Sequence, residues 1–175
     1  MSNQTATLEK KNPMQEIRIE KIILSVGGKD KELEKSKKLI EFISGKTPQK
    51  IASRKRIPDF GVSPGVFVGA RVTLRGEDAS KLLGKLLGAL NNTLSTDQVS
   101  DNHFSFGIKE YIEIPGVEYH REIGIRGFNV TVVFIRPGFR VKRKKIKSGK
   151  LPERQMISVD EIKKYMEEKF GAEFN

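Results

Sequence analysis

The chain contains no cysteine and only two histidines among its 175 residues. Without cysteine, disulfide bonds, thiolate zinc sites and a cysteine nucleophile are all excluded. His103 and His120 are 17 positions apart in loop-like sequence, which is not the spacing of metal ligands. We therefore expect no bound metal, no cofactor and no catalytic histidine.

Other catalytic patterns are missing as well. The Gly27-Gly28 pair follows a strand-like run, but no Lys-Ser or Lys-Thr comes after it, so it is not a phosphate-binding loop. Ser25 lacks the glycines of a nucleophile elbow. Asp97 and Asp101 form a polar loop pair without the apolar shielding that an acid–base pair needs. The sequence predicts a protein that is not an enzyme.

Long hydrophobic runs are also absent. No run approaches the roughly 18 apolar residues of a membrane helix, and the first residues lack the apolar core of a signal peptide. Hydrophobic residues make up 37% of the chain, whose length is that of one domain with a core of its own. We expect a soluble, cytoplasmic protein that contacts no membrane.

Positive charge is abundant and unevenly distributed. The formal net charge is +11. Residues 136–150, called the basic segment below, hold eight basic side chains and no acidic one, and residues 46–75 hold seven basic and one acidic. Such cations bind a polyanion because each neutralised phosphate releases a condensed counterion. Two separate basic stretches favour a bipartite contact with nucleic acid over a solvated basic tail.

The apolar periodicity predicts an α+β fold: an antiparallel β-sheet with helices packed on one face, plus long basic and Pro/Gly-rich loops. Strands are expected over 17–26, 49–51, 66–74, 103–107, 111–115 and 128–135, and helices over 31–44, 77–90 and 159–170. The alternation changes phase at Glu20-Lys21, which predicts a β-bulge. Asp30 and a capping box at Ser158–Glu161 are expected to start helices, and Gly84 and Gly88 to pack closely against the sheet.

The domain organisation is simple. Residues 1–13 are polar and Lys-rich, and we expect a disordered N-terminal arm there. Residues 14–175 contain no internal repeat, and we expect them to form a single RNA-binding α+β domain.

Two segments supply binding chemistry. Residues 54–65 contain two prolines and two glycines, begin with three basic residues, and indicate a semi-stiff loop. The basic segment, fully extended, spans about 50 Å, enough to follow several phosphates. Phe60, Phe67 and Phe139 lie in or near these segments, where they either stack on exposed bases or pack within the protein.

Longer strings carry a family resemblance. They occur in the order KIILSVGG (21–28), ISGKTP (43–48), RVTLRG (71–76), FGIKE (106–110) and GIRGFN (124–129). Together they resemble ribosomal protein five of the large subunit, the universal family that binds 5S ribosomal RNA. The string RPGFRV (136–141) with its basic tract resembles the archaeal and eukaryotic branch of that family.

The resemblance implies a place in the central protuberance of the large ribosomal subunit. There the family anchors 5S rRNA to the large-subunit rRNA, beside neighbouring proteins of the protuberance. It also contacts ribosomal protein thirteen of the small subunit in an intersubunit bridge. The loop 54–65 corresponds to the family's loop that reaches toward the peptidyl-site tRNA.

Charge and resemblance together predict two sets of site residues. The rRNA-binding set is Ser25, Arg71, Thr73, Arg140, Lys142, Arg143, Lys144, Lys145 and Lys147. The tRNA-facing set is Arg54, Lys55, Arg56, Phe60 and Pro64. Two positions depart from the family pattern: Ser25 stands where Asn is common, and Pro64 stands where bacterial members have Gln.

The hypothesis is therefore a ribosomal RNA-binding protein whose role is architectural. Taken alone, the residues also leave room for a general nucleic-acid chaperone or DNA-binding module, for an RNA-modifying enzyme, and for a protein-binding scaffold. The scaffold leaves the eight cations of the basic segment unexplained.

Overall fold

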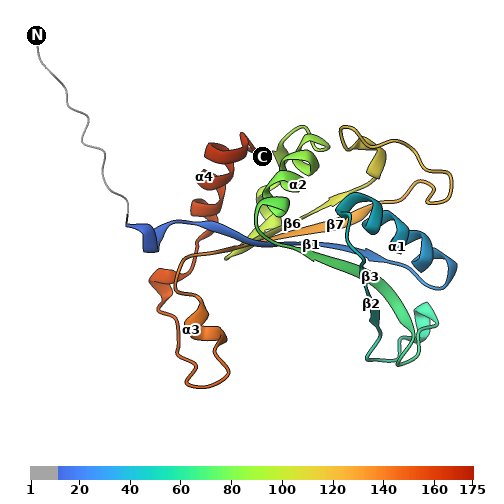
Figure 1. Ribbon diagram of the computed structural model, residues 1–175, viewed down its shortest axis with the longest axis horizontal. Coiled ribbons are helices and arrows are strands. Elements are labelled where there is room, and N and C mark those ends of the chain that lie inside the picture. The colour runs from blue at the N-terminus through green and yellow to red at the C-terminus, as the bar shows by residue number, and fades with distance from the viewer. Residues whose placement is uncertain (1–11) are drawn as a thin grey trace, which may run out of the picture.

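A computed structural model describes residues 12–175 (Figure 1). Its strands and longer helices are β1 (Arg18–Gly27), α1 (Lys31–Ser44), β2 (Gln49–Ala52), β3 (Phe67–Leu74), α2 (Glu77–Gly88), β4 (Thr93–Leu94), β5 (Val99–Ser100), β6 (His103–Ile108), β7 (Phe128–Ile135), α3 (Arg140–Arg143), α4 (Val159–Phe170) and β8 (Glu173–Phe174).

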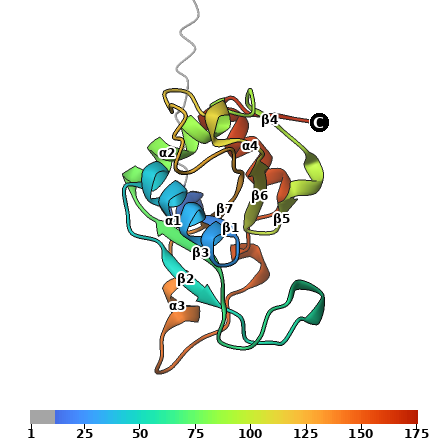
Figure 2. The ribbon, with the colours of Figure 1, turned by 90° about the vertical axis from the view of Figure 1, so that its right-hand side faces the viewer.

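Six strands form one sheet in the order β2-β3-β1-β7-β6-β5, and every neighbouring pair is antiparallel. β4 and β8 form a separate two-stranded parallel sheet. Helices α1, α2 and α4 cover one face of the large sheet, whereas α3 lies on the other side (Figures 1 and 2). The predicted α+β class, with an antiparallel sheet and its long helices on one face, is confirmed.

The predicted bulge in β1 is present and sets the orientation of the whole strand. Ile19 pairs with Phe134 and Lys21 with the next residue back, Val133, so Glu20 is an extra residue without a partner on β7. Beyond the bulge, Ile22, Leu24 and Val26 point into the core. If Glu20 took a regular place in the strand instead of bulging, strict alternation would put Ile19 and the later apolar residues on opposite faces.

The core lies between the sheet and its three long helices. One continuous cluster joins buried residues of β1, β3, β6 and β7 to those of the helices, including Leu39, Leu83 and Ile162. The rings of Phe104 and Phe134 stack at 5.8 Å between centroids within this cluster. The opposite face of the large sheet carries none of the long helices and is called the open face below.

Some local predictions need correction. Residues 111–113 form a 3-10 helix rather than a strand, because the Ile114 N–H donates back to the Tyr111 carbonyl at 3.3 Å instead of to a neighbouring strand. Asp30 makes no capping hydrogen bond, since its backbone adopts a positive φ of 50°. A Cβ at Gly84 would meet nothing within 4 Å, and one at Gly88 would meet Pro115, so neither glycine packs against the sheet.

The ends of the helices are otherwise as the sequence indicates. The capping box of α4 forms, with the Glu161 carboxylate accepting a hydrogen bond from the Ser158 backbone N–H at 3.2 Å. The predicted N-terminal arm lies outside the described residues as far as residue 11, and Pro13 already belongs to a 3-10 helix, Pro13–Gln15.

The two faces of β1 predict a contrast between adjacent residues. Leu24→Ala removes a fully buried side chain and should lower the free energy of unfolding by about 2–5 kcal/mol. Ser25→Ala, on the open face, should change it by no more than about 0.5 kcal/mol. Denaturant unfolding measures both values, and equal losses would contradict the assignment of the two faces.

Candidate nucleic-acid interface

The open face presents small polar side chains in rows across the strands. Ser25 of β1 pairs in register with Arg71 of β3 on one side and with Asn129 of β7 on the other. Arg71 and Asn129 are exposed, and their strand neighbours Val72 and Val130 are buried on the core side. The structure therefore brings Ser25 and Arg71, predicted from distant parts of the sequence, to paired positions on adjacent strands.

A second row runs beside the first. Ile23 pairs with Thr73 of β3 and with Thr131 of β7, and Thr131 pairs with Ser105 of β6. The hydroxyls of Ser105 and Thr131 share a hydrogen bond of 3.0 Å. Hydroxyl and amide groups on an uncovered sheet face are suited to sugar and phosphate contacts, which need donors and acceptors rather than stacking rings.

Three residues of these rows, Asn129, Thr131 and Ser105, were missed as site residues from the sequence. The alternation of β7 already separated Asn129 and Thr131 from the apolar Val130 and Val132. Only the pairing of β1 with β7, which no local pattern encodes, shows that they share a face with Ser25.

The loop between β2 and β3, residues 53–66, is called the proline loop, and its shape is held by a bridge within it and by a contact from Lys29. A bridge joins Ile57 and Val62, and the Lys29 ammonium donates a 2.8 Å hydrogen bond to the Gly61 carbonyl at the end of its 3-10 turn. Phe60, in that turn, is 76% exposed. The loop thus holds an aromatic ring in solvent on a stiff support.

The other predicted residues of the proline loop are exposed too. Arg54, Lys55, Arg56 and Pro64 all face solvent. Within residues 12–175, none of the three cations forms an ion pair.

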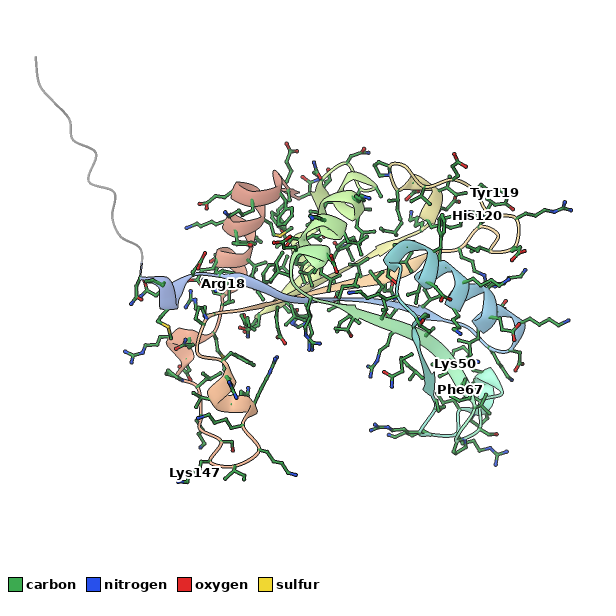
Figure 3. The ribbon with its side chains drawn as sticks, viewed as in Figure 1. Arg18, Lys50, Phe67, Tyr119, His120 and Lys147 are labelled. Atoms are coloured by element: carbon green, nitrogen blue, oxygen red, sulfur yellow. The ribbon has the colours of Figure 1, made fainter. Side chains whose placement is uncertain are left out.

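A further aromatic ring lies near the proline loop. The Lys50 ammonium lies 5.6 Å from the centroid of the half-exposed Phe67 ring (Figure 3). Phe67 lines a hollow with Asp30 and Lys31 at the start of α1. Its ring is therefore partly occupied by contacts within the protein.

The basic segment projects to the same side as the proline loop, from the other end of the sheet (Figures 1 and 2). The first residue of the segment, Arg136, is only 11% exposed and pairs with Glu161 of α4 at 2.6 Å. It also donates a 2.8 Å hydrogen bond to the Arg154 carbonyl. The Gln155 amide donates to the Pro137 carbonyl at 2.7 Å. These contacts fix where the segment leaves the sheet.

Arg143 is held by the bulge of β1. Its guanidinium donates two hydrogen bonds, of 2.5 and 2.6 Å, to the carboxylate of Glu20. The same guanidinium lies 4.8 Å from the centroid of the Phe139 ring, which therefore packs within the protein. The hydrogen bonds from Arg143 lower the pKa of Glu20, against burial, which raises it.

The remaining cations of the basic segment are exposed. None of them forms an ion pair with the residues that the structure describes. They are Arg140, Lys142, Lys144, Lys145, Lys147 and Lys150. Figure 3 shows Lys147 at the tip of the segment, far below the sheet. Such cations keep their charge available for an outside polyanion.

The described part of the chain offers little for catalysis. No three His, Asp or Glu residues between 12 and 175 are grouped to hold a metal ion. His103 contacts the Asp101 carbonyl at 3.1 Å, and His120 packs edge-on against Phe42. Among residues 12–175 no helix has both the length and the apolar character to cross a membrane.

An α+β fold with an uncovered polar sheet face between two exposed basic projections fits the class of architectural proteins that bind nucleic acid. Comparison with known families makes this specific. The sequence model described as "Ribosomal protein L5" matches residues 12–62, and the model for the C-terminus of the same ribosomal protein family matches residues 67–168. The chain belongs to the ribosomal protein L5 family.

Archaeal relatives are similar over nearly the whole chain. The large ribosomal subunit protein uL5 of Nanoarchaeum equitans is 39% identical, covering 93% of this chain and 98% of the relative. Those of Methanobrevibacter smithii and Nitrosopumilus maritimus are each 37% identical, covering 93% and 92% of this chain and 98% and 95% of the relatives. The predicted family and its archaeal type are confirmed.

Membership settles the broad role. The chain is a structural constituent of the large subunit of the cytoplasmic ribosome, and it is not an enzyme.

The Glu20–Arg143 pair predicts a pH dependence. Because the folded protein lowers the pKa of Glu20, the pair stabilises the fold above the ordinary pKa of a glutamate, and this stability is lost as the pH falls through the lowered value. Glu20→Gln should therefore lower the free energy of unfolding at pH 7 by about 1 kcal/mol or less, because Arg143 is half exposed. At pH 3, nearer the pKa of the carboxyl, the loss should be smaller still.

Denaturant unfolding at the two pH values measures this difference. Glu16→Gln is the control, because within residues 12–175 Glu16 pairs only with the exposed Arg18 two residues away. A Glu20→Gln difference that stays the same at both pH values would contradict the role of the ionised pair.

Proposed function

We propose that this chain binds 5S rRNA and helps attach it to the large-subunit rRNA in the central protuberance. The observation that carries the proposal is the open face, a polar sheet surface that α1, α2 and α4 leave uncovered, between two basic projections. Most cations of these projections form no ion pair with residues 12–175. Family membership supports the proposal, since the resemblance first seen in the sequence strings implies 5S rRNA as partner.

The chemistry of the open face favours structured RNA. Its two central rows offer Ser25, Thr73, Ser105, Asn129 and Thr131, and contain no aromatic ring. Double-stranded RNA is recognised mainly by shape and through its phosphates and 2′-hydroxyls, whereas single strands need stacking platforms. The rows would therefore contact the sugar–phosphate backbone, while the lysines of the basic segment supply affinity through phosphates.

The proline loop serves a different RNA in this proposal. Its exposed cations Arg54, Lys55 and Arg56 and the exposed ring of Phe60 stand at the opposite end of the sheet from the basic segment. We assign it to the peptidyl-site tRNA, as the family resemblance implies. The Pro64 side chain can make only van der Waals contact, because it carries no hydrogen-bonding group.

Protein partners complete the proposal. The family resemblance implies ribosomal protein thirteen of the small subunit, through an intersubunit bridge, and neighbouring proteins of the central protuberance. The open face and the basic segment are assigned to RNA, so these protein contacts would use other surfaces.

Salt dependence tests the RNA contact. With about five to eight phosphate contacts, the logarithm of the affinity for 5S rRNA should fall with the logarithm of salt concentration at a slope of roughly −4 to −7. Neutralising three lysines of the basic segment should make the slope shallower by about 3. The three are Lys144, Lys145 and Lys147, each replaced by Gln.

The matched control removes the same charge from exposed lysines of α1 and α2, on the other side of the sheet. These are Lys31, Lys35 and Lys85, each replaced by Gln. The control should leave the slope within about 1 of wild type. An affinity for 5S rRNA that does not change with salt concentration would overturn 5S rRNA as the specific partner. Equal binding to 5S rRNA and to duplex DNA in a competition assay would do the same.

Footprinting assigns the two projections. Replacing Arg54, Lys55 and Arg56 by Gln should expose the tRNA nucleotides that the protein protects from cleavage in assembled ribosomes. The protected nucleotides of 5S rRNA should stay protected. The triple lysine variant of the basic segment should do the reverse. Loss of the same protected nucleotides in both variants would contradict the separate assignments.

A further inference from the structure

Glu20 is an unusual residue for an RNA-binding surface. It is an acidic side chain near the start of β1, and Arg143 of the basic segment contacts it there. A carboxylate beside a phosphate-binding surface repels the ligand, so a free one there would weaken binding. Glu20 is not free: its side chain is 6% exposed and lies under the Arg143 guanidinium.

The bulge is what aims Glu20 at the basic segment. As the extra residue between Ile19 and Lys21, it takes no place in the pairing with β7. Its carboxylate accepts both short hydrogen bonds from Arg143, while the Lys21 ammonium is 4.0 Å away. A two-point guanidinium–carboxylate contact fixes orientation as well as distance.

The outer part of the basic segment has few other contacts. α3 is a single turn of four residues with no buried side chain, too short to be stable alone. Phe139 is partly buried beneath Arg143, and the Gly149 N–H donates to the Val141 carbonyl at 3.2 Å. From 140 to 150 every residue is exposed. The contact with Glu20 is thus the one ion pair, among the described residues, that links α3 to the sheet.

We propose that Glu20 is a positioning residue for RNA binding, which holds α3 and its exposed cations against the open face in the orientation that meets the phosphates. Arg143 then acts mainly as the protein's own anchor, and Arg140, Lys142, Lys144, Lys145 and Lys147 act as the phosphate ligands. The inference rests on the proposed RNA-binding function.

The proposal reverses the ordinary electrostatic expectation. Removing a negative charge from a cationic RNA-binding surface normally tightens binding. If Glu20 positions the segment, Glu20→Gln weakens binding instead, because a neutral amide replaces the carboxylate that holds Arg143. Cations on a mobile segment lose more conformational entropy on binding.

The first experiment measures the affinity of the full chain for 5S rRNA over a range of salt concentrations. Glu20→Gln should bind up to about fivefold more weakly, the largest effect expected from losing one half-exposed ion pair that positions the segment. The salt slope should stay near the wild-type value, since every phosphate ligand remains. The matched control Glu16→Gln, exposed on the chain just before β1, should bind as wild type or slightly more tightly.

A second variant separates charge from geometry. Arg143→Lys keeps the positive charge but loses the two-pronged guanidinium, so it should also bind more weakly. The charge exchange of Glu20→Arg with Arg143→Glu should recover part of the affinity lost in either single exchange.

Hydrogen–deuterium exchange of the free protein gives a readout without RNA. Residues 139–149 should exchange faster in Glu20→Gln than in wild type, with the strands of the sheet unchanged. Equal or tighter RNA binding by Glu20→Gln, or unchanged exchange in 139–149, would overturn the positioning role. If wild type itself does not bind 5S rRNA, the proposed function fails, and the exchange result still decides whether Glu20 tethers the segment.

Discussion

The structure depends on one constraint on β1, the strand at the centre of the sheet. The core residues from Ile17 to Val26 must all face the helices on one side, while the polar residues stay uncovered on the other. Strict alternation cannot satisfy this requirement, because Ile17 and Ile19 are out of phase with Ile22. The bulge at Glu20 meets this constraint by correcting the phase of the strand. Ile19 and Ile22 then both face the core, and Ser25 becomes the middle of a polar row joining three strands.

The two basic projections differ in how the protein supports them. The proline loop is stiffened from within, by the Ile57–Val62 bridge and its 3-10 turn. The basic segment is supported from outside, by Glu161 at its base and Glu20 beneath α3. The proline loop therefore offers a ligand a preformed shape. The basic segment offers a high density of positive charge, which two carboxylates hold in place.

Much of this could be predicted from the sequence, because local patterns encode local structure. Apolar periodicity located the long helices and most of the strands, and the phase change located the bulge. The string GIRGFN shows a limit: a Cβ at Gly127 would lie 2.5 Å from the Ile108 carbonyl oxygen, so this glycine is required by packing, a reason that the sequence does not display. The partners of Arg136 and Arg143 were equally hidden, since their carboxylates lie 25 and 123 residues away.

The order of the strands has a consequence for how the chain is made. β1 pairs with β3, close behind it, but its other edge pairs with β7, whose last residue is Ile135. On the ribosome that synthesises it, the chain can therefore complete only half of its sheet until about three quarters of its length has emerged. During that interval one edge of β1 lacks its strand partner, and the nascent protein has an unfinished sheet of the kind that chaperones protect.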